Sequence, residues 1–309
     1  MKPAVDVVHL KKSYGPVRAV EDVSFAVEPG AIFGLVGPNG AGKTTTIECI
    51  EGLRSPDAGQ VRVLGLDPVR SRFVLYRSLG VQLQENSLYS RIGAREALRL
   101  FGSFFASPLP PDRLLREFGL EDQAKTWYGK LSGGHKRKLL TALALVGRPR
   151  IVLLDEPTTG LDPQSRLNFW DVLRRYRDEG LTIVLTTHDL LEAEESCDVV
   201  CVIDQGRVVA LGPPSRLIAG HRLGVRIAAR RPGNGFDPAA LAAHPAVTRV
   251  EVLEDRVYAF GDGAGFPTDV FQLLRTHGVE DVSSRPANLE DLYLILTGRG
   301  YRKEGGVAA

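Results

Sequence analysis

The sequence contains no long hydrophobic run. No apolar stretch reaches the roughly 18 to 20 residues that a helix needs to cross a bilayer. The first residues, MKPAVDVVHLKK, also lack the apolar centre of a signal peptide. These absences argue against an integral membrane or secreted protein, and we expect a cytoplasmic chain.

Cysteine and net charge are scarce as well. The three cysteines, Cys49, Cys197 and Cys201, lie among apolar residues and form no paired framework, which favours buried, reduced thiols. No His/Cys pair accompanies them, so a structural metal site is not expected. The formal net charge is +2 and no basic tail is present, so we expect no nucleic-acid partner.

The most informative segment is GPNGAGKT, which fits the pattern G-x-x-x-x-G-K-[ST] between an apolar strand at 32–36 and a helix at 45–53. Glycines let the connecting backbone turn tightly and point several N–H groups at one anion, next to the positive end of the helix dipole. Lys43 is then expected to reach the outer phosphates of ATP, and the Thr44 hydroxyl to ligate Mg²⁺. The residues expected to bind the nucleotide here are Gly37, Pro38, Asn39, Gly40, Ala41, Gly42, Lys43, Thr44 and Thr45.

Two carboxylates follow the apolar run at 151–154. A buried strand would carry Asp155 and Glu156 to its carboxyl end, where α/β sheets bind ligands. Phosphoryl transfer requires charge neutralisation and a positioned nucleophile, so Asp155 is predicted to hold Mg²⁺ and Glu156 to polarise the attacking water. Taken alone, either acid could instead cap the next helix.

Further motifs occur in a fixed order: LSGGH from Leu131, LLDEP around Asp155, and TTHD ending at Asp189. With these motifs, residues 4 to 220 resemble an ABC-type ATPase subunit. The resemblance implies a set of roles for single residues. Tyr14 stacks on adenine with Val20 beside it, Gln84 senses Mg²⁺ and the water, Asp162 lies in the loop that crosses between subunits, and His188 is the switch histidine at the terminal phosphate.

The segment Ser132-Gly133-Gly134 precedes a helix and leaves backbone N–H groups uncovered, so it is a second surface suited to phosphate. An ordinary serine helix cap fits the same residues. In the resembling family this element binds the ATP of the opposite subunit, which implies a head-to-tail dimer. Each motif occurs once, so the chain is expected to pair with itself or with a similar chain, and a homodimer is the first expectation. The family's usual glutamine is replaced by His135, whose role the sequence leaves open.

The predicted fold is α/β: a P-loop NTPase core of ABC type with an N-terminal antiparallel β subdomain and a helical subdomain at about 86–146. Alternating strands and helices favour this core. We place a domain boundary near residue 219. The remainder, 220–309, follows the order β-α-β-β-α-β with an added C-terminal helix, which suggests a small ferredoxin-like domain with a regulatory or dimer-supporting role.

Two functions compete: the motor of a membrane transporter with separate permease subunits, and a soluble ABC ATPase. One ATPase unit without coiled-coil or zinc insertions favours the transporter, located at the inner face of the cell membrane. The tail PANLEDLY resembles export subunits of the daunorubicin-resistance kind, although a plain amphipathic helix would give the same spacing. The expected function is multidrug or antibiotic efflux, with lipid or polysaccharide export as the alternative.

Overall fold

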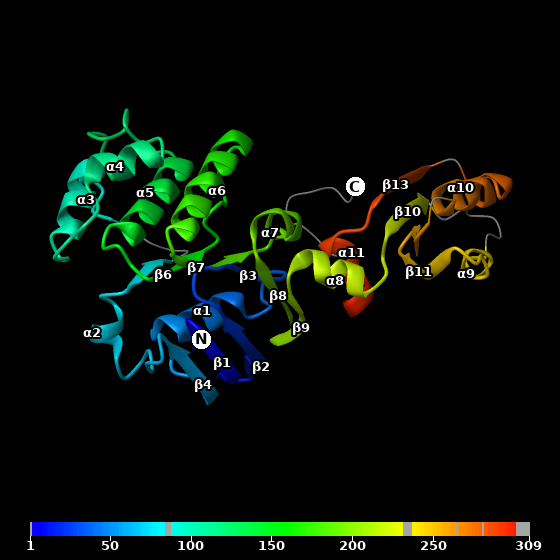
Figure 1. The fold of residues 1–309 in the computed structure, drawn as a ribbon, viewed down its shortest axis with the longest axis horizontal. Helices are drawn as coiled ribbons and strands as arrows, with labels where there is room; N and C mark the ends of the chain where they lie inside the picture. Colours follow the sequence, from blue (N-terminus) through cyan, green and yellow to red (C-terminus); the bar gives the residue numbers. More distant parts are fainter. Residues whose placement is uncertain (1, 84–87, 231–236, 264, 280, 301–309) are drawn as a thin grey trace. The chain divides into compact units, whose positions relative to one another are not determined.

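A computed structural model describes residues 2–83, 88–230, 237–263, 265–279 and 281–300. It divides into two compact units (Figure 1). Unit 1 comprises Met1–Asp189 and Ser196–Leu211, and unit 2 comprises Leu190–Glu195 and Gly212–Ala309. The second unit therefore begins before the expected boundary at 219 and also includes a short segment from within the ATPase region.

In the described residues, unit 1 contains a nine-stranded sheet of order β4-β1-β2-β9-β8-β3-β7-β6-β5. The strands β1, β2 and β4 pair antiparallel, whereas β3, β5, β6, β7 and β8 pair parallel. The parallel strands are almost continuously apolar and buried, as expected for a sheet covered on both faces. Their bounds are β1 Val5–Tyr14, β2 Val17–Val27, β3 Ile32–Val36, β4 Ala58–Val63, β5 Leu79–Gln82, β6 Ile151–Asp155, β7 Thr182–Thr187, β8 Val199–Asp204 and β9 Arg207–Gly212.

The helices of unit 1 begin with α1, which follows the glycine-rich loop. This helix runs from Lys43 to Glu51, earlier at both ends than predicted, because Gly42 and Gly52 adopt left-handed conformations on either side of it. In the predicted helical region, α3, α4 and α5 pack on one another. The remaining bounds are α2 Arg72–Leu75, α3 Ala94–Gly102, α4 Pro111–Glu117, η1 Tyr128–Lys130, α5 Gly133–Leu145 and α6 Pro163–Asp178.

Unit 2 has its own sheet, of order β11-β12-β10-β13, in which every neighbouring pair is antiparallel. Apolar residues of β10, β12 and α10 form its core, among them Ile227, Val257, Phe266 and Val270. The elements are α7 Leu190–Ser196, α8 Pro214–Gly220, β10 Val225–Arg230, α9 Ala239–Ala242, β11 Val247–Leu253, β12 Arg256–Gly261, α10 Phe266–Thr276, β13 Val282–Pro286 and α11 Leu289–Thr297. No helix in the described parts of the chain has the length and apolarity to span a membrane.

Candidate active site

The loop between β3 and α1 requires glycine at two positions. Gly37 and Gly42 have φ values of 155° and 104°. A Cβ atom on Gly37 would lie 2.1 Å from the Ile203 carbonyl oxygen, and one on Gly42 would lie 2.3 Å from the Ala19 carbonyl oxygen. Side chains are therefore excluded at these points by close backbone contacts as well as by conformation.

Lys43 lies over this loop with only 5% of its surface exposed. Its Nζ donates to the carbonyl oxygens of Gly37 at 2.8 Å and Pro38 at 3.0 Å. Burial lowers the pKa of the Lys43 ammonium, whereas the nearby Glu156 and Asp155 raise it. The ammonium is thus fixed between the loop and the two predicted acidic residues.

Asp155 ends β6 as a buried carboxylate, and its pKa is raised chiefly by that burial. Hydrogen bonds from the Thr186 and Thr44 hydroxyls and the charge of Lys43 act in the opposite direction. Thr186 belongs to β7, which lies between β3 and β6 in the sheet. Two of the three residues predicted at Mg²⁺, Thr44 and Asp155, therefore lie together near the ends of these neighbouring strands.

Glu156 follows directly, with φ at 48°, a left-handed value that costs a non-glycine residue roughly 1–2 kcal/mol. Its backbone N–H donates to the Thr186 hydroxyl at 2.9 Å. Its carboxylate accepts from the Thr159 hydroxyl at 3.1 Å, and His188 Nδ1 lies 3.1 Å from the other carboxylate oxygen. The loop thus turns Glu156 toward His188, which stands just beyond the end of β7.

The segment Ser132–Gly134 lies apart from the glycine-rich loop in sequence and begins α5. Ser132 Oγ caps that helix by accepting from the backbone N–H of His135, and the His135 ring lies 3.0 Å from the same hydroxyl. A Cβ atom on Gly134 would lie 3.3 Å from the Leu161 side chain and 3.4 Å from the Gly160 carbonyl oxygen. The two loops predicted to face a second subunit are therefore neighbours, and Asp162 caps α6 by accepting from Ser165 N–H at 2.9 Å.

The remaining predicted residues have simpler surroundings. Tyr14 is 40% exposed, and the cationic groups of Lys12 and Arg54 each lie 5.8 Å from its ring centre. Val20 is buried, and its methyl group would meet a Cβ on Gly42 at 3.4 Å. Gln84 lies outside the described residues. The other loop residues, Pro38, Asn39, Gly40, Ala41 and Thr45, precede or begin α1.

For two residues at or near this site, Thr186 and Glu51, no role was predicted from the sequence. Thr186 connects Asp155 with the backbone of Glu156, and the available signal was a threonine at the polar end of an apolar strand. Glu51, in α1, is fully buried, and neither carboxylate oxygen has a hydrogen-bond partner among the described residues. Burial, Asp155 and Glu48 raise the pKa of Glu51 to about 8. In the sequence, the only indication that Glu51 is buried was its position four residues after Ile47 on the same face of the helix.

Comparisons with known proteins agree with this geometry. Residues 20–159 match the family model described as ABC transporter. Nod factor export ATP-binding protein I of Rhizobium sp. (strain N33) is 40% identical over 308 residues, covering 98% of this chain and 99% of that protein. Its counterpart in Paraburkholderia xenovorans (strain LB400) is 41% identical over 306 residues, covering 96% and 97%.

A solved structure described as the ATP binding subunit of an ABC transporter is 32% identical, with a TM-score of 0.64 over 70% of this chain and 92% of that one. The two relatives match nearly the whole chain, through both of its units. The chain therefore belongs to the ATP-binding subunits of ABC transporters and is an ATPase.

Proposed function

We propose that this chain hydrolyses Mg-ATP to drive a membrane exporter whose spanning subunits are separate proteins. The observation that carries the proposal is the convergence of Lys43, Asp155, Glu156 and His188 at the carboxyl ends of three neighbouring strands. ATP hydrolysis needs a phosphate-binding loop, a metal ligand and an oriented water, and each requirement has a residue in this group.

The donors fit Mg²⁺, which prefers hard oxygen ligands and retains several waters. Asp155 and Thr44 supply a carboxylate and a hydroxyl that lie within hydrogen-bonding distance of each other. The ion would neutralise charge on the β- and γ-phosphates. Lys43 would bind the same phosphates, and Gln84 is proposed as the residue that senses both the metal and the water.

Glu156 is the proposed general base. The Thr159 hydroxyl and the His188 ring hold its carboxylate from two sides, which limits the directions from which it can accept a proton from water. His188 is proposed to contact the terminal phosphate as well, so that it joins the base to the group being transferred. Tyr14 and Val20 are proposed to contact the adenine.

The working unit is proposed to be a head-to-tail homodimer. Ser132 and Gly133 are exposed at the start of α5, next to the loop that ends at Asp162, and together they form a surface suited to the phosphates of ATP bound by another subunit. In the single chain, the Ser132 hydroxyl lies within hydrogen-bonding distance of the His135 ring nitrogen Nδ1. ATP from a partner would compete for the same hydroxyl.

Mixing two inactive variants tests this arrangement. Lys43→Ala removes the loop cation, and Ser132→Ala removes the hydroxyl of the opposite surface. A mixed dimer contains one site with both defects and one site with neither, so mixing should restore a measurable part of the ATPase activity. If dimers form on mixing but no activity returns, the composite site is refuted.

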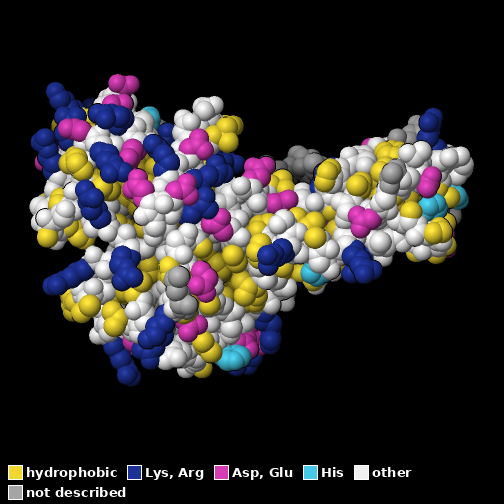
Figure 2. All heavy atoms as spheres, in the orientation of Figure 1, with side chains coloured by type: hydrophobic (Ala, Val, Ile, Leu, Met, Phe, Trp, Pro, Cys, Tyr) yellow, Lys and Arg dark blue, Asp and Glu magenta, His cyan; other side chains and the backbone are white. Residues whose placement is uncertain are grey.

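Exposed apolar side chains support a permease partner. They occur on and near α2 and α3, in the same unit, and Figure 2 shows hydrophobic side chains reaching the surface around α2. The most exposed are Phe73, Tyr89 and Phe104, at 84%, 72% and 72%. Phe73→Ser should weaken co-purification with the permease and leave basal ATPase activity unchanged, and equal recovery of wild-type and variant complexes would exclude Phe73 from the contact.

The finer assignments remain part of this proposal: an ATPase domain at 1–219, a ferredoxin-like domain at 220–309 with a regulatory or dimer-supporting role, and location at the inner face of the membrane. The names of the relatives favour export as the direction of transport. Two cargoes are proposed. The daunorubicin-type tail favours multidrug or antibiotic efflux, whereas the similarity to Nod factor export proteins favours a cargo resembling Nod factor. Transport assays in vesicles containing the permease would distinguish the two.

A further inference from the structure

The helix that follows the proposed switch histidine belongs to the C-terminal unit. His188 lies in unit 1, whereas α7 begins two residues later at Leu190 and is assigned to unit 2 up to Glu195. The backbone that carries His188 therefore continues directly into unit 2. Any contact that fixes α7 within unit 2 also restrains the chain next to His188.

One contact of this kind is a hydrogen bond from α11. The backbone N–H of Leu289, in the first turn of α11, donates to a carboxylate oxygen of Glu194 at 2.8 Å. That N–H has no partner inside its own helix, and a carboxylate at a helix N-terminus is further favoured by the helix dipole. Glu194 thus caps α11 from a different helix.

The N-terminus of α11 is itself firmly held. Asn288 caps it, and Asp291, which is 2% exposed, accepts from Arg285 at 2.8 Å and from Arg226 at 3.2 Å. The Asp291 carboxylate is buried beneath these two partly exposed arginines, and a change of position would leave it unpaired, so the group is held in place. The partner of Glu194 is therefore a fixed point in unit 2.

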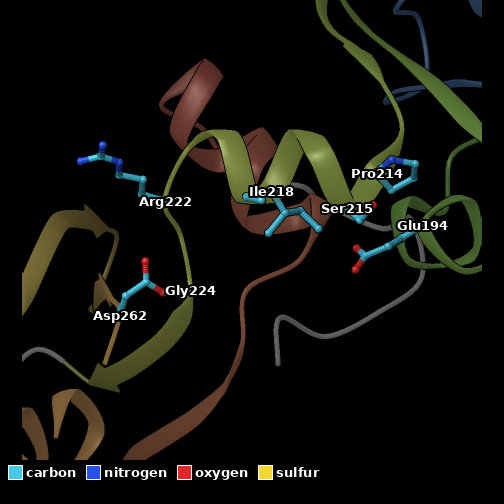
Figure 3. A pocket seen from close by; sticks show the side chains of 8 residues that line it. Glu194, Pro214, Ser215, Ile218, Arg222, Gly224 and Asp262 are labelled. Atoms are coloured by element: carbon cyan, nitrogen blue, oxygen red, sulfur yellow. The ribbon is translucent and has the colours of Figure 1, made fainter. Parts of the chain in front are cut away.

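The hydrogen bond to Leu289 keeps the Glu194 carboxylate in a half-buried position that disfavours its charged form. Glu194 lines a cavity of about 590 Å³ that Ser215 and Ile218 of α8 also line (Figure 3). Burial is the main cause that raises the pKa of its carboxyl, and Asp291 and Glu195 raise it too. The Leu289 N–H and Arg285 lower it.

We propose that Glu194 is a positioning residue for hydrolysis: through its hydrogen bond to Leu289, the C-terminal unit fixes α7 and thereby the backbone that places His188 against Glu156. This inference rests on the proposed function. It gives the C-terminal unit a direct influence on turnover, separate from ATP binding. Glu194 is not expected to touch ATP.

The test uses the full-length chain and two readouts. Glu194→Ala should lower the turnover number about 3- to 30-fold, the range typical of coupling between sites, with an unchanged KM for ATP. Hydrogen exchange of the peptide 188–196 should become faster, while that of the peptide 37–51 should not change. Glu194→Gln retains an acceptor oxygen and should restore both readouts. Glu195→Ala, on the exposed side of α7, is the matched control and should match wild type.

A second pair of variants covers the possibility that Glu194→Ala unfolds. Leu289→Pro removes the donating N–H at the first helical position, where proline is tolerated, and Leu289→Ala keeps the N–H but removes the same packing. Leu289→Pro should have the lower turnover number of the two. Equal turnover in this pair, or a folded Glu194→Ala chain with wild-type turnover and exchange, would overturn the proposal.

Failure of the proposed function would look different. In that case the wild-type chain itself would show no ATP hydrolysis that Lys43→Ala removes. The exchange of the peptide 188–196 would still decide whether Glu194 positions this segment.

Discussion

Thr186→Val tests the hydrogen bonds that hold the proposed metal ligand Asp155 and the proposed base Glu156. Thr186 is fully buried, donates to Asp155 and accepts from the Glu156 N–H at 2.9 Å. Valine has nearly the same shape, so it leaves one oxygen and one N–H in the interior without these partners. Each such loss costs about 1–3 kcal/mol, and more for a charged group. Burial of the added methyl group returns about 0.8 kcal/mol, so we expect the free energy of unfolding to fall by about 1 to 5 kcal/mol.

The measurement is urea unfolding followed by tryptophan emission. Both tryptophans of the chain, Trp127 and Trp170, lie in unit 1, so the signal reports on the unit that contains the substitution. Thr186→Ser keeps the hydroxyl and should remain within about 1.5 kcal/mol of wild type, since it loses only a methyl group. If Thr186→Val unfolds within about 0.5 kcal/mol of wild type with the same slope, the hydroxyl does not have the structural role described here.

Two further predictions concern the nucleotide loop and its helix. Gly42→Ala places a Cβ 2.3 Å from the Ala19 carbonyl oxygen. A strain of about 1–3 kcal/mol in the glycine-rich loop should weaken ATP binding about 5- to 150-fold in a fluorescence titration. Gly40, at φ 78°, shares the left-handed conformation, but a Cβ there meets no atom within 4 Å, so Gly40→Ala should lose less affinity than Gly42→Ala. Equal losses would contradict the steric argument. Glu51 has a pKa raised from 4.5 to about 8, so the folded chain keeps a proton that the unfolded chain releases, and stability falls as pH rises through that interval. The unfolding free energy of Glu51→Gln, measured relative to wild type by urea titration, should therefore rise by about 1.4 kcal/mol per pH unit from about pH 5 to 8. A pH-independent difference would contradict the assignment.

The geometry of the glycine-rich loop could be predicted from the sequence because it depends on residues that follow one another in the chain. The spacing of Gly37, Gly42 and Lys43 is itself the loop, and an apolar strand ending in Asp155 leaves few alternatives for where that carboxylate lies. The expected ATPase family and its export function follow from motifs of the same local kind.

Contacts between residues that are distant in the sequence could not be predicted in this way. Thr186 reaches Asp155 because β7 pairs with β6, a pairing that no local pattern specifies. The bond between Glu194 and Leu289 joins residues 95 positions apart, and each residue alone is an ordinary part of an amphipathic helix. Assignment of α7 to the second unit likewise depends on packing. The expected boundary near 219 falls inside α8, because the glycine and prolines at 212–214 and the glycine at 220 mark breaks in the sequence, whereas the structure has one helix from Pro214 to Gly220.

The most direct test of the account is the turnover of Glu156→Gln. Glutamine keeps the size of the side chain but cannot accept the proton of the attacking water, so steady-state ATP hydrolysis should fall at least about 100-fold. ATP binding in a fluorescence titration should stay near that of wild type, because the substitution leaves Lys43 and the glycine-rich loop, the proposed phosphate-binding groups, unchanged. Light scattering should detect an ATP-dependent dimer. Wild-type hydrolysis by Glu156→Gln would contradict the assignment of Glu156 as the base.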